Sequence, residues 1–208
     1  MYAGCRNGNV VLLILVFALC GGCATRAPDN VDDLCAIFDD KGSWYGDARK
    51  AERRWGTPIP VLMAIIHQES RFDARARPPR KRILGFIPGP RPSDSYGYSQ
   101  ALKSTWAAYR RSAGRYGADR DDFADAIDFV GWYSQQSTRR NGIGAADAYR
   151  LYLAYHEGHG GYERGTYRNK AWLQAVARKV AARAGRYEAQ LAVCRDRLEE
   201  GRGWFGWF

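Results

Sequence analysis

Apolar residues recur at helical spacing along most of the chain and almost never alternate with a period of two. Helical spacing gathers apolar side chains on one stripe of a helix, whereas a half-buried strand needs alternation. The pattern therefore predicts an all-α fold. A length of 208 residues suits one domain with a sizeable core. Neither an internal repeat nor a second domain is evident.

Caps, prolines and glycines divide the chain into expected helices. Asn30 or Asp29 would cap the first helix, and Gly56 would end the second. The glycine-rich segment 156–161 is expected to be a loop. The expected helical ranges are about 30–40, 44–55, 57–71, 99–114, 122–140, 147–155 and 170–198. Several polar motifs then fall where a helix meets a loop.

Glu69 lies near the end of the third expected helix, where Ile66, Ile65 and Leu62 precede it by three, four and seven positions. It would therefore face the core. Apolar neighbours and the negative end of the helix dipole would both raise the pKa of its carboxyl group. An acid that stays protonated near neutral pH can donate a proton to a glycosidic oxygen. The alternative is a glutamate that closes the helix and points into water.

The first residues predict secretion. The apolar run 10–19 has the length of a signal-peptide core and is too short to span a bilayer. Small residues and Cys23 follow, and the string at 19–23 resembles a bacterial lipobox. Cys20 stands where leucine is commonest in that motif, so an ordinary signal peptide is the alternative.

With the lipobox interpretation, the chain divides into a signal peptide at 1–22, a lipidated N-terminus and tether at 23–30, and one domain at 31–208. Cys23 would carry the acyl chains. The residue after it is Ala24 rather than aspartate, which resembles the signal for sorting to the outer membrane. The expected location is the periplasm, with the lipid anchor in the inner leaflet of the outer membrane.

The chain has five cysteines, and three of them fall in the expected signal and lipidation segment. Cys35 and Cys194 remain, near opposite ends of the domain. In an oxidising compartment two such thiols favour one disulfide that closes a very long loop. Two unpaired buried cysteines are the alternative.

Segment 75–92 interrupts the helical pattern. It holds five of the eight prolines and six basic residues, and it has no acid. The prolines exclude a continuous helix, so a loop or extended arm is expected. Its place after Glu69 suggests a wall or lid beside a cleft, and the alternative is a solvated basic insertion without function. The apolar residues within it favour docking against another surface. With the net charge of +10, it favours contact with anionic wall polymer or lipid headgroups.

Three polar blocks stand at helix–loop junctions: Glu69-Ser70, Ser95 to Gln100, and Ala154 to Gly158. In order and spacing they resemble the soluble lytic transglycosylase domain of bacterial cell walls, which has a lysozyme-like fold. That family carries Glu-Ser at a helix end, then Gly-Leu-Met-Gln, then Ala-Tyr-Asn-Ala-Gly. Here Tyr98-Ser99 replaces Leu-Met and His156-Glu157 replaces Asn-Ala. The departures suggest a branch similar to the endo-acting, membrane-bound transglycosylases.

The resemblance implies that Glu69 is the catalytic acid and base. It implies that Gln100 lines the sugar groove and that the Tyr155 hydroxyl orients the carboxylate. The expected substrate-binding residues are Ser70, Ser95, Tyr96, Tyr98, Gln100, Tyr155, His156 and Glu157. The implied reaction cleaves the β-1,4 bond between N-acetylmuramic acid and N-acetylglucosamine in peptidoglycan strands and forms a 1,6-anhydro sugar.

Two alternatives stay open. The first is a muramidase, a hydrolase that pairs Glu69 with a second carboxylate from Asp73, Asp94 or Glu157. The second is a peptidoglycan-binding lipoprotein without catalysis, although such a protein would not need an acid on a buried stripe.

No cofactor, metal or nucleic-acid partner is expected, and the chain is expected to be a monomer. His156 and His159 flank a glutamate, but their spacing fits no helical zinc motif. His67 is expected to pack in the core. The aromatic tail 203–208 is expected either to touch a membrane interface or to pack back over the domain.

Overall fold

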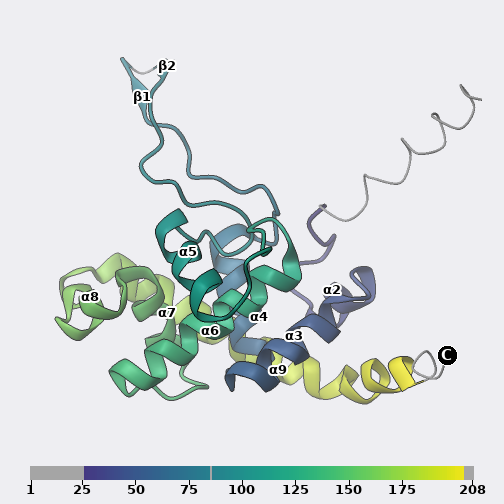
Figure 1. Ribbon diagram of the computed structural model, residues 1–208. Helices are drawn as coiled ribbons and strands as arrows, with labels where there is room; N and C mark the ends of the chain where they lie inside the picture. The colour runs from purple at the N-terminus through teal and green to yellow at the C-terminus, as the bar shows by residue number, and fades with distance from the viewer. Residues whose placement is uncertain (1–25, 85, 204–208) are drawn as a thin grey trace, which may run out of the picture.

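The computed structural model describes residues 26–84 and 86–203, which form a body of packed helices and one projecting arm (Figure 1). The expected signal peptide, Cys23 and the tail residues 204–208 lie outside the described part. Within the described part, no helix is both long and apolar enough to cross a bilayer.

The predicted all-α class is confirmed for the body. Its helices are α2 (Leu34–Asp40), α3 (Trp44–Trp55), α4 (Ile59–Ser70), α5 (Lys103–Ser112), α6 (Phe123–Asn141), α7 (Ala148–Glu157), α8 (His159–Glu163), the 3-10 helix η1 (Thr166–Asn169) and α9 (Ala171–Gly203). The arm carries a small antiparallel pair, β1 (Arg82–Ile83) and β2 (Ile87–Pro88). Gly56 and Gly142 end α3 and α6 in the left-handed conformation that favours glycine.

Three boundaries differ from the sequence prediction. Asp33, rather than Asn30 or Asp29, caps α2 by accepting hydrogen bonds from two backbone amides. Residues 97–100 form a turn closed by a bridge between Tyr96 and Ala101, so α5 begins only at Lys103. The glycine-rich segment is partly helical as α8, because Gly161 lets this short helix approach Glu157, where an added Cβ would lie 3.2 Å from the glutamate Cβ.

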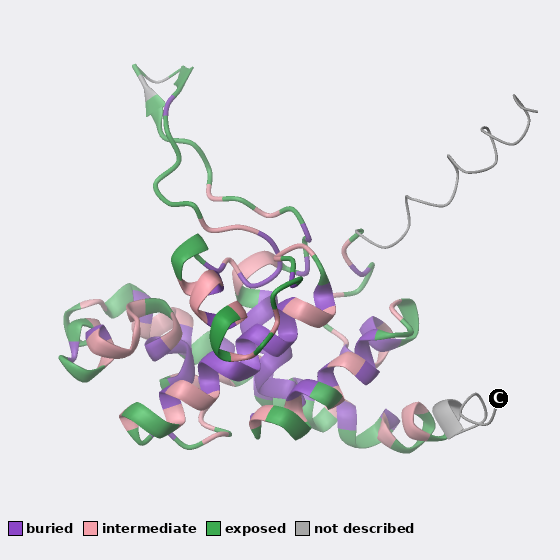
Figure 2. Cartoon of the chain, viewed as in Figure 1, coloured by how far each residue is buried: buried purple, intermediate pink, exposed green. Residues whose placement is uncertain are grey.

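Helix α4 is the centre of the body. Its residues from Ile59 to His67 are all buried, because α3, α6, α7 and α9 pack around it. Figure 2 shows this buried centre, with exposed residues on the outer helices. A helix that is apolar on every side must be covered by neighbours, which fixes where its C-terminal end and Glu69 lie.

A buried acid ties the neighbouring helices together. Asp128 on α6 accepts hydrogen bonds from the indole of Trp55 at 2.8 Å and from the hydroxyl of Tyr109 at 2.6 Å. It also lies 3.2 Å from the guanidinium of Arg54. These partners satisfy a carboxylate that would otherwise be costly to bury, and they join α3, α5 and α6.

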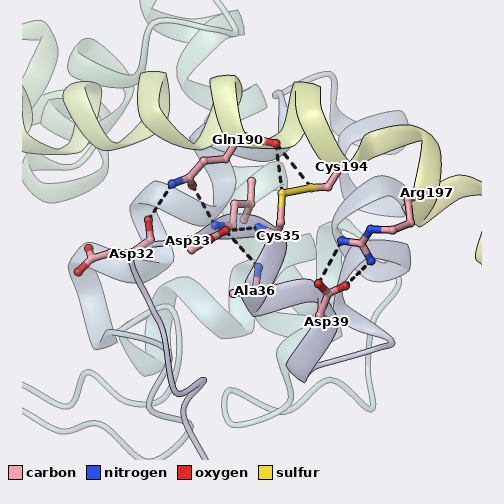
Figure 3. Close-up of a disulfide and its surroundings, with 9 residues drawn as sticks. Asp32, Asp33, Cys35, Ala36, Asp39, Gln190, Cys194 and Arg197 are labelled. Atoms are coloured by element: carbon pink, nitrogen blue, oxygen red, sulfur yellow. Dashed lines mark hydrogen bonds and ion pairs between the residues drawn. A yellow bond between two sulfur atoms is a disulfide. The ribbon is translucent and has the colours of Figure 1, made fainter.

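The predicted disulfide is present. Cys35 on α2 and Cys194 on α9 are bonded across 159 positions of sequence. Figure 3 shows Gln190 beside the bridge, where its side chain accepts from the amide of Leu34 and donates to the carbonyl of Asp32. The long last helix is thereby held against the start of the domain.

Removing this bridge should destabilise the fold. Because it closes a loop of 159 residues, replacing both cysteines by alanine is expected to lower the free energy of unfolding by about 2–5 kcal/mol. Urea unfolding of the double variant and of the native protein measures the difference. Equal unfolding midpoints would show that the bridge adds no stability.

Candidate active site

The end of α4 turns sharply just after Glu69. Pro60 opens the helix at an early position, and Arg71 and Phe72 end it with positive φ angles of 51° and 63°. A bulky residue rarely adopts that conformation. Phe72 adopts it with its side chain fully buried, at 5.7 Å from the ring of Trp44. Core packing thus fixes the chain reversal that follows Glu69.

The Glu69 carboxyl group lies in apolar surroundings. The residue as a whole is half-buried, and no basic side chain forms an ion pair with it among residues 26–84 and 86–203. Burial raises the pKa of Glu69 from its usual 4.5 to about 7, and a weaker effect of the Tyr152 hydroxyl lowers it. This carboxyl group can therefore both donate and accept a proton near neutral pH.

Two tyrosines of α7 connect the three sequence blocks. Tyr152 interacts with Glu69 through its hydroxyl group. Tyr155, one helical turn later, donates a hydrogen bond of 2.7 Å to the carbonyl of Ser99. Burial raises the pKa of Tyr155, the negative charge of Glu69 raises it further, and α4 packs against α7. The three blocks therefore meet at one place.

Tyr152 was not among the predicted site residues, yet its hydroxyl group lowers the pKa of Glu69. The resemblance implies that Tyr155 orients the carboxylate, and in the structure the Tyr155 hydroxyl group donates to the carbonyl of Ser99. Tyr152 precedes Tyr155 by three positions, so both lie on one helical face. That spacing is the sequence signal that could have identified it.

Gln100 holds the turn beside the site. Its amide donates hydrogen bonds of 2.9 Å to the carbonyls of Ala76 and Gly97, and its oxygen accepts one from Ser95. A Cβ on Gly97 would lie 2.0 Å from the carbonyl oxygen of Arg120, so this position requires glycine. Gln100 and Ser95 therefore position the turn, because their polar atoms are already engaged.

The tyrosines of the second block are also engaged within the fold. The hydroxyl of Tyr96 donates to Asp121 at 2.9 Å, and Arg77 and Arg120 lie over its ring. Tyr98 is only 1% exposed and packs edge-on against the ring of Trp44. Its side chain is a core element without access to a polymer.

Glu157 is a paired acid rather than a free one. Lys170 lies 2.8 Å from both carboxylate oxygens, and Thr166 and His156 contact one oxygen each. Burial opposes ionisation, but these partners together hold the pKa of Glu157 at about 2. It is therefore ionised and fully engaged, while the ring of His156 stays exposed beside Trp172.

Ser70 and two further acids that the sequence offers as partners of Glu69 have local hydrogen bonds, whereas the buried ring of His67 has no hydrogen-bond partner among the described residues. Ser70 donates its hydroxyl to the carbonyl of Ile66 within α4. Asp73 is exposed and accepts from the amide of Arg75, and Asp94 is exposed and accepts from the amide of Lys103. His67 is buried as expected, and burial lowers its pKa to about 4, so its ring is neutral.

A hollow of about 450 Å³ lies beside Tyr133. The ring of Tyr133 lines it, packs at 5.1 Å against Tyr155 and stacks at 4.3 Å on His159. The other lining residues are Ser104, Thr105, Ala108, Trp132, Gln136 and Arg140. Aromatic faces with polar groups around them suit a sugar ring, so the hollow is a candidate binding surface that the sequence did not reveal.

The raised pKa of Glu69 has a consequence for stability. A carboxyl group of higher pKa in the folded state stabilises the fold below the unfolded pKa of 4.5, and that contribution is lost as the pH rises through 7. Glu69→Gln should therefore unfold like the native protein at pH 4 but be more stable by about 1–3 kcal/mol at pH 8. Denaturant unfolding at both pH values measures this. Glu188→Gln, at an exposed glutamate, is the control, and an equal gain there would contradict the assignment.

Comparison with known families agrees with this geometry. No curated protein matches the chain. The family model described as "Transglycosylase SLT domain" matches residues 10–194, which include α2 to α7 and most of α9. The match spans the Glu69 helix, the Gln100 turn and the two tyrosines of α7, and the helical body agrees with a lysozyme-like domain. The chain therefore belongs to the transglycosylase SLT domain family.

Proposed function

We propose that the protein is a peptidoglycan lytic transglycosylase in which Glu69 acts first as acid and then as base. The observation that carries the proposal is a half-buried carboxyl group with a pKa near 7 and no cationic partner among the described residues. It lies where the three blocks of the family pattern meet. Such a group can exchange a proton in both directions at one pH.

In the first step, protonated Glu69 donates its proton to the oxygen that links N-acetylmuramic acid to N-acetylglucosamine. The glycosidic bond breaks and its electron pair goes to the departing sugar oxygen. The resemblance implies that the acetamido oxygen of the muramic sugar stabilises the cationic centre. A second protein carboxylate is then unnecessary at that position.

In the second step, ionised Glu69 removes the proton of the muramoyl 6-hydroxyl group. That oxygen bonds to the anomeric carbon and closes the 1,6-anhydro ring, and Glu69 regains its proton. No water is consumed. The reaction is intramolecular, so a well-held substrate gains the rate advantage of proximity. In this proposal Tyr152 holds the carboxyl group in place through both steps.

The competing hydrolase needs a second carboxylate at the site. Glu157 has both oxygens engaged by Lys170, Thr166 and His156. Asp73 and Asp94 are exposed and accept from the backbone amides of Arg75 and Lys103. None of the three is held free beside Glu69, which supports the transglycosylase over the muramidase.

Mass spectrometry of digested peptidoglycan tests the proposal. The native protein should release fragments that end in anhydro-muramic acid, and Glu69→Gln should lower that activity by about 10³-fold or more while staying folded. Glu157→Gln is the matched control, and it should still form the anhydro product. Reducing-end muramic acid, or a Glu157 variant as inactive as the Glu69 variant, would favour the hydrolase.

We also propose that the chain works in the periplasm, anchored to the outer membrane through acylated Cys23, and acts on glycan strands as a monomer. The disulfide supports this location, because such bonds persist in oxidising compartments. The mass of the mature N-terminus would identify the anchor, and an N-terminus without a diacylglyceryl group would contradict it.

A further inference from the structure

Segment 77–95 forms an arm that leaves the helical body and returns to the same point. At its base the amide of Gly97 and the side chain of Gln100 both donate to the carbonyl of Ala76. Beyond that base the arm projects away from the helices (Figure 1). The outer part of the arm therefore does not form the expected wall or lid beside a cleft, because it stands away from the helices (Figure 1). Its extended, proline-rich character was predicted correctly.

The tip of the arm is apolar and exposed. Leu84 is 78% exposed, Phe86 is 73% exposed and Ile87 is 43% exposed. Leu84 and Phe86 lie in the turn between β1 and β2, and Ile87 lies in β2 opposite Ile83. Most of the apolar surface of Leu84 and Phe86 is left uncovered by the described residues, which points to an external apolar phase.

The conformation of Leu84 strengthens this point. Its φ angle is 53°, a left-handed turn position at which glycine or asparagine is favoured. A leucine does not stabilise this turn conformation, and the described residues leave most of the Leu84 side chain exposed. The residue therefore contributes through what its side chain meets outside the molecule.

Cationic residues lie directly behind the tip. Arg80, Lys81, Arg82 and Arg91 are exposed, and none forms an ion pair with an acidic side chain in the described part of the chain. Arg80 and Arg91 donate to carbonyls across the arm, which holds their charges along it. The arm therefore has an apolar end with cationic residues next to it. Leu84, Phe86 and Ile87 are called the arm tip, and the four cationic residues are called the basic collar.

We propose that the arm tip inserts into the surface of an anionic phospholipid bilayer, with the basic collar against the lipid phosphates. A bilayer offers this sequence of layers, with negative headgroups above an apolar interior. Hydrated glycan strands offer no apolar phase to receive leucine and phenylalanine. The contact is separate from any N-terminal anchor and from the chemistry at Glu69, and it would fix how the body stands on the membrane.

Trypsin can report the contact in the full-length protein. Arg77 and Arg91 precede prolines, which block trypsin, so cleavage of the arm falls after residues 80–82. Vesicles of phosphatidylcholine with one quarter phosphatidylglycerol should slow this cleavage by about tenfold, because each basic residue near an anionic surface favours binding. Vesicles of phosphatidylcholine alone should slow it less than about twofold.

A tip variant tests the apolar part. Leu84→Asp with Phe86→Asp should abolish the protection by anionic vesicles. The matched control is Val193→Asp, at a residue of α9 that is 87% exposed, and it should be protected like the native chain. Both variants should keep the native thermal unfolding midpoint, since neither site is in the core.

Several outcomes would overturn the proposal. Equal protection by the two vesicle types would remove the role of the basic collar. Protection of the tip variant would show that the apolar side chains are not inserted. Purified peptidoglycan sacculi form a further arm of the experiment, and protection by sacculi but not by vesicles would assign the arm to the wall polymer. Absence of protection in every condition would leave a protein partner.

Discussion

The proposed chemistry depends on one carboxyl group that is withdrawn from water and forms no ion pair within residues 26–84 and 86–203. Glu69 stands at the end of α4, a helix whose residues from Ile59 to His67 are all buried. Loss of water raises its pKa to about 7 because no cation compensates the charge. An arginine at that place would keep the group ionised and remove its ability to donate a proton. The apolar side chains that surround α4 therefore form the core of the fold and, in the proposed mechanism, also give Glu69 its ability to exchange a proton.

The helices that pack around α4 are held in place by contacts that do not involve Glu69. Asp128 joins three helices through an indole, a hydroxyl and a guanidinium. The disulfide fixes α9 against α2, and α9 in turn covers α4. Gln100 closes the turn that faces Tyr155. None of these contacts uses the carboxyl group of Glu69, which forms no ion pair in the described part of the chain.

The features of the fold that follow from periodicity and residue type could be predicted from the sequence. The helices, the Gly56 and Gly142 ends, the disulfide and the inward position of Glu69 all rest on spacing and on residue type. The prediction failed where an outcome depended on tertiary contacts. Tyr98 is a core residue because Trp44 and Phe123 surround it. A motif position carries no information about which side of a turn its side chain will take.

The two tyrosines of α7 illustrate the same limit more finely. The motif identifies Tyr155, but the backbone of the Gln100 turn places the carbonyl of Ser99 within 2.7 Å of its hydroxyl group. One turn earlier, Tyr152 then meets Glu69. If the proposed chemistry is correct, the turn and the acid are coupled through adjacent positions of one rigid helix. A change at Gln100 would therefore be transmitted to the carboxyl group of Glu69 through α7. No hydrogen bond joins the side chains of Gln100 and Glu69 within the described residues.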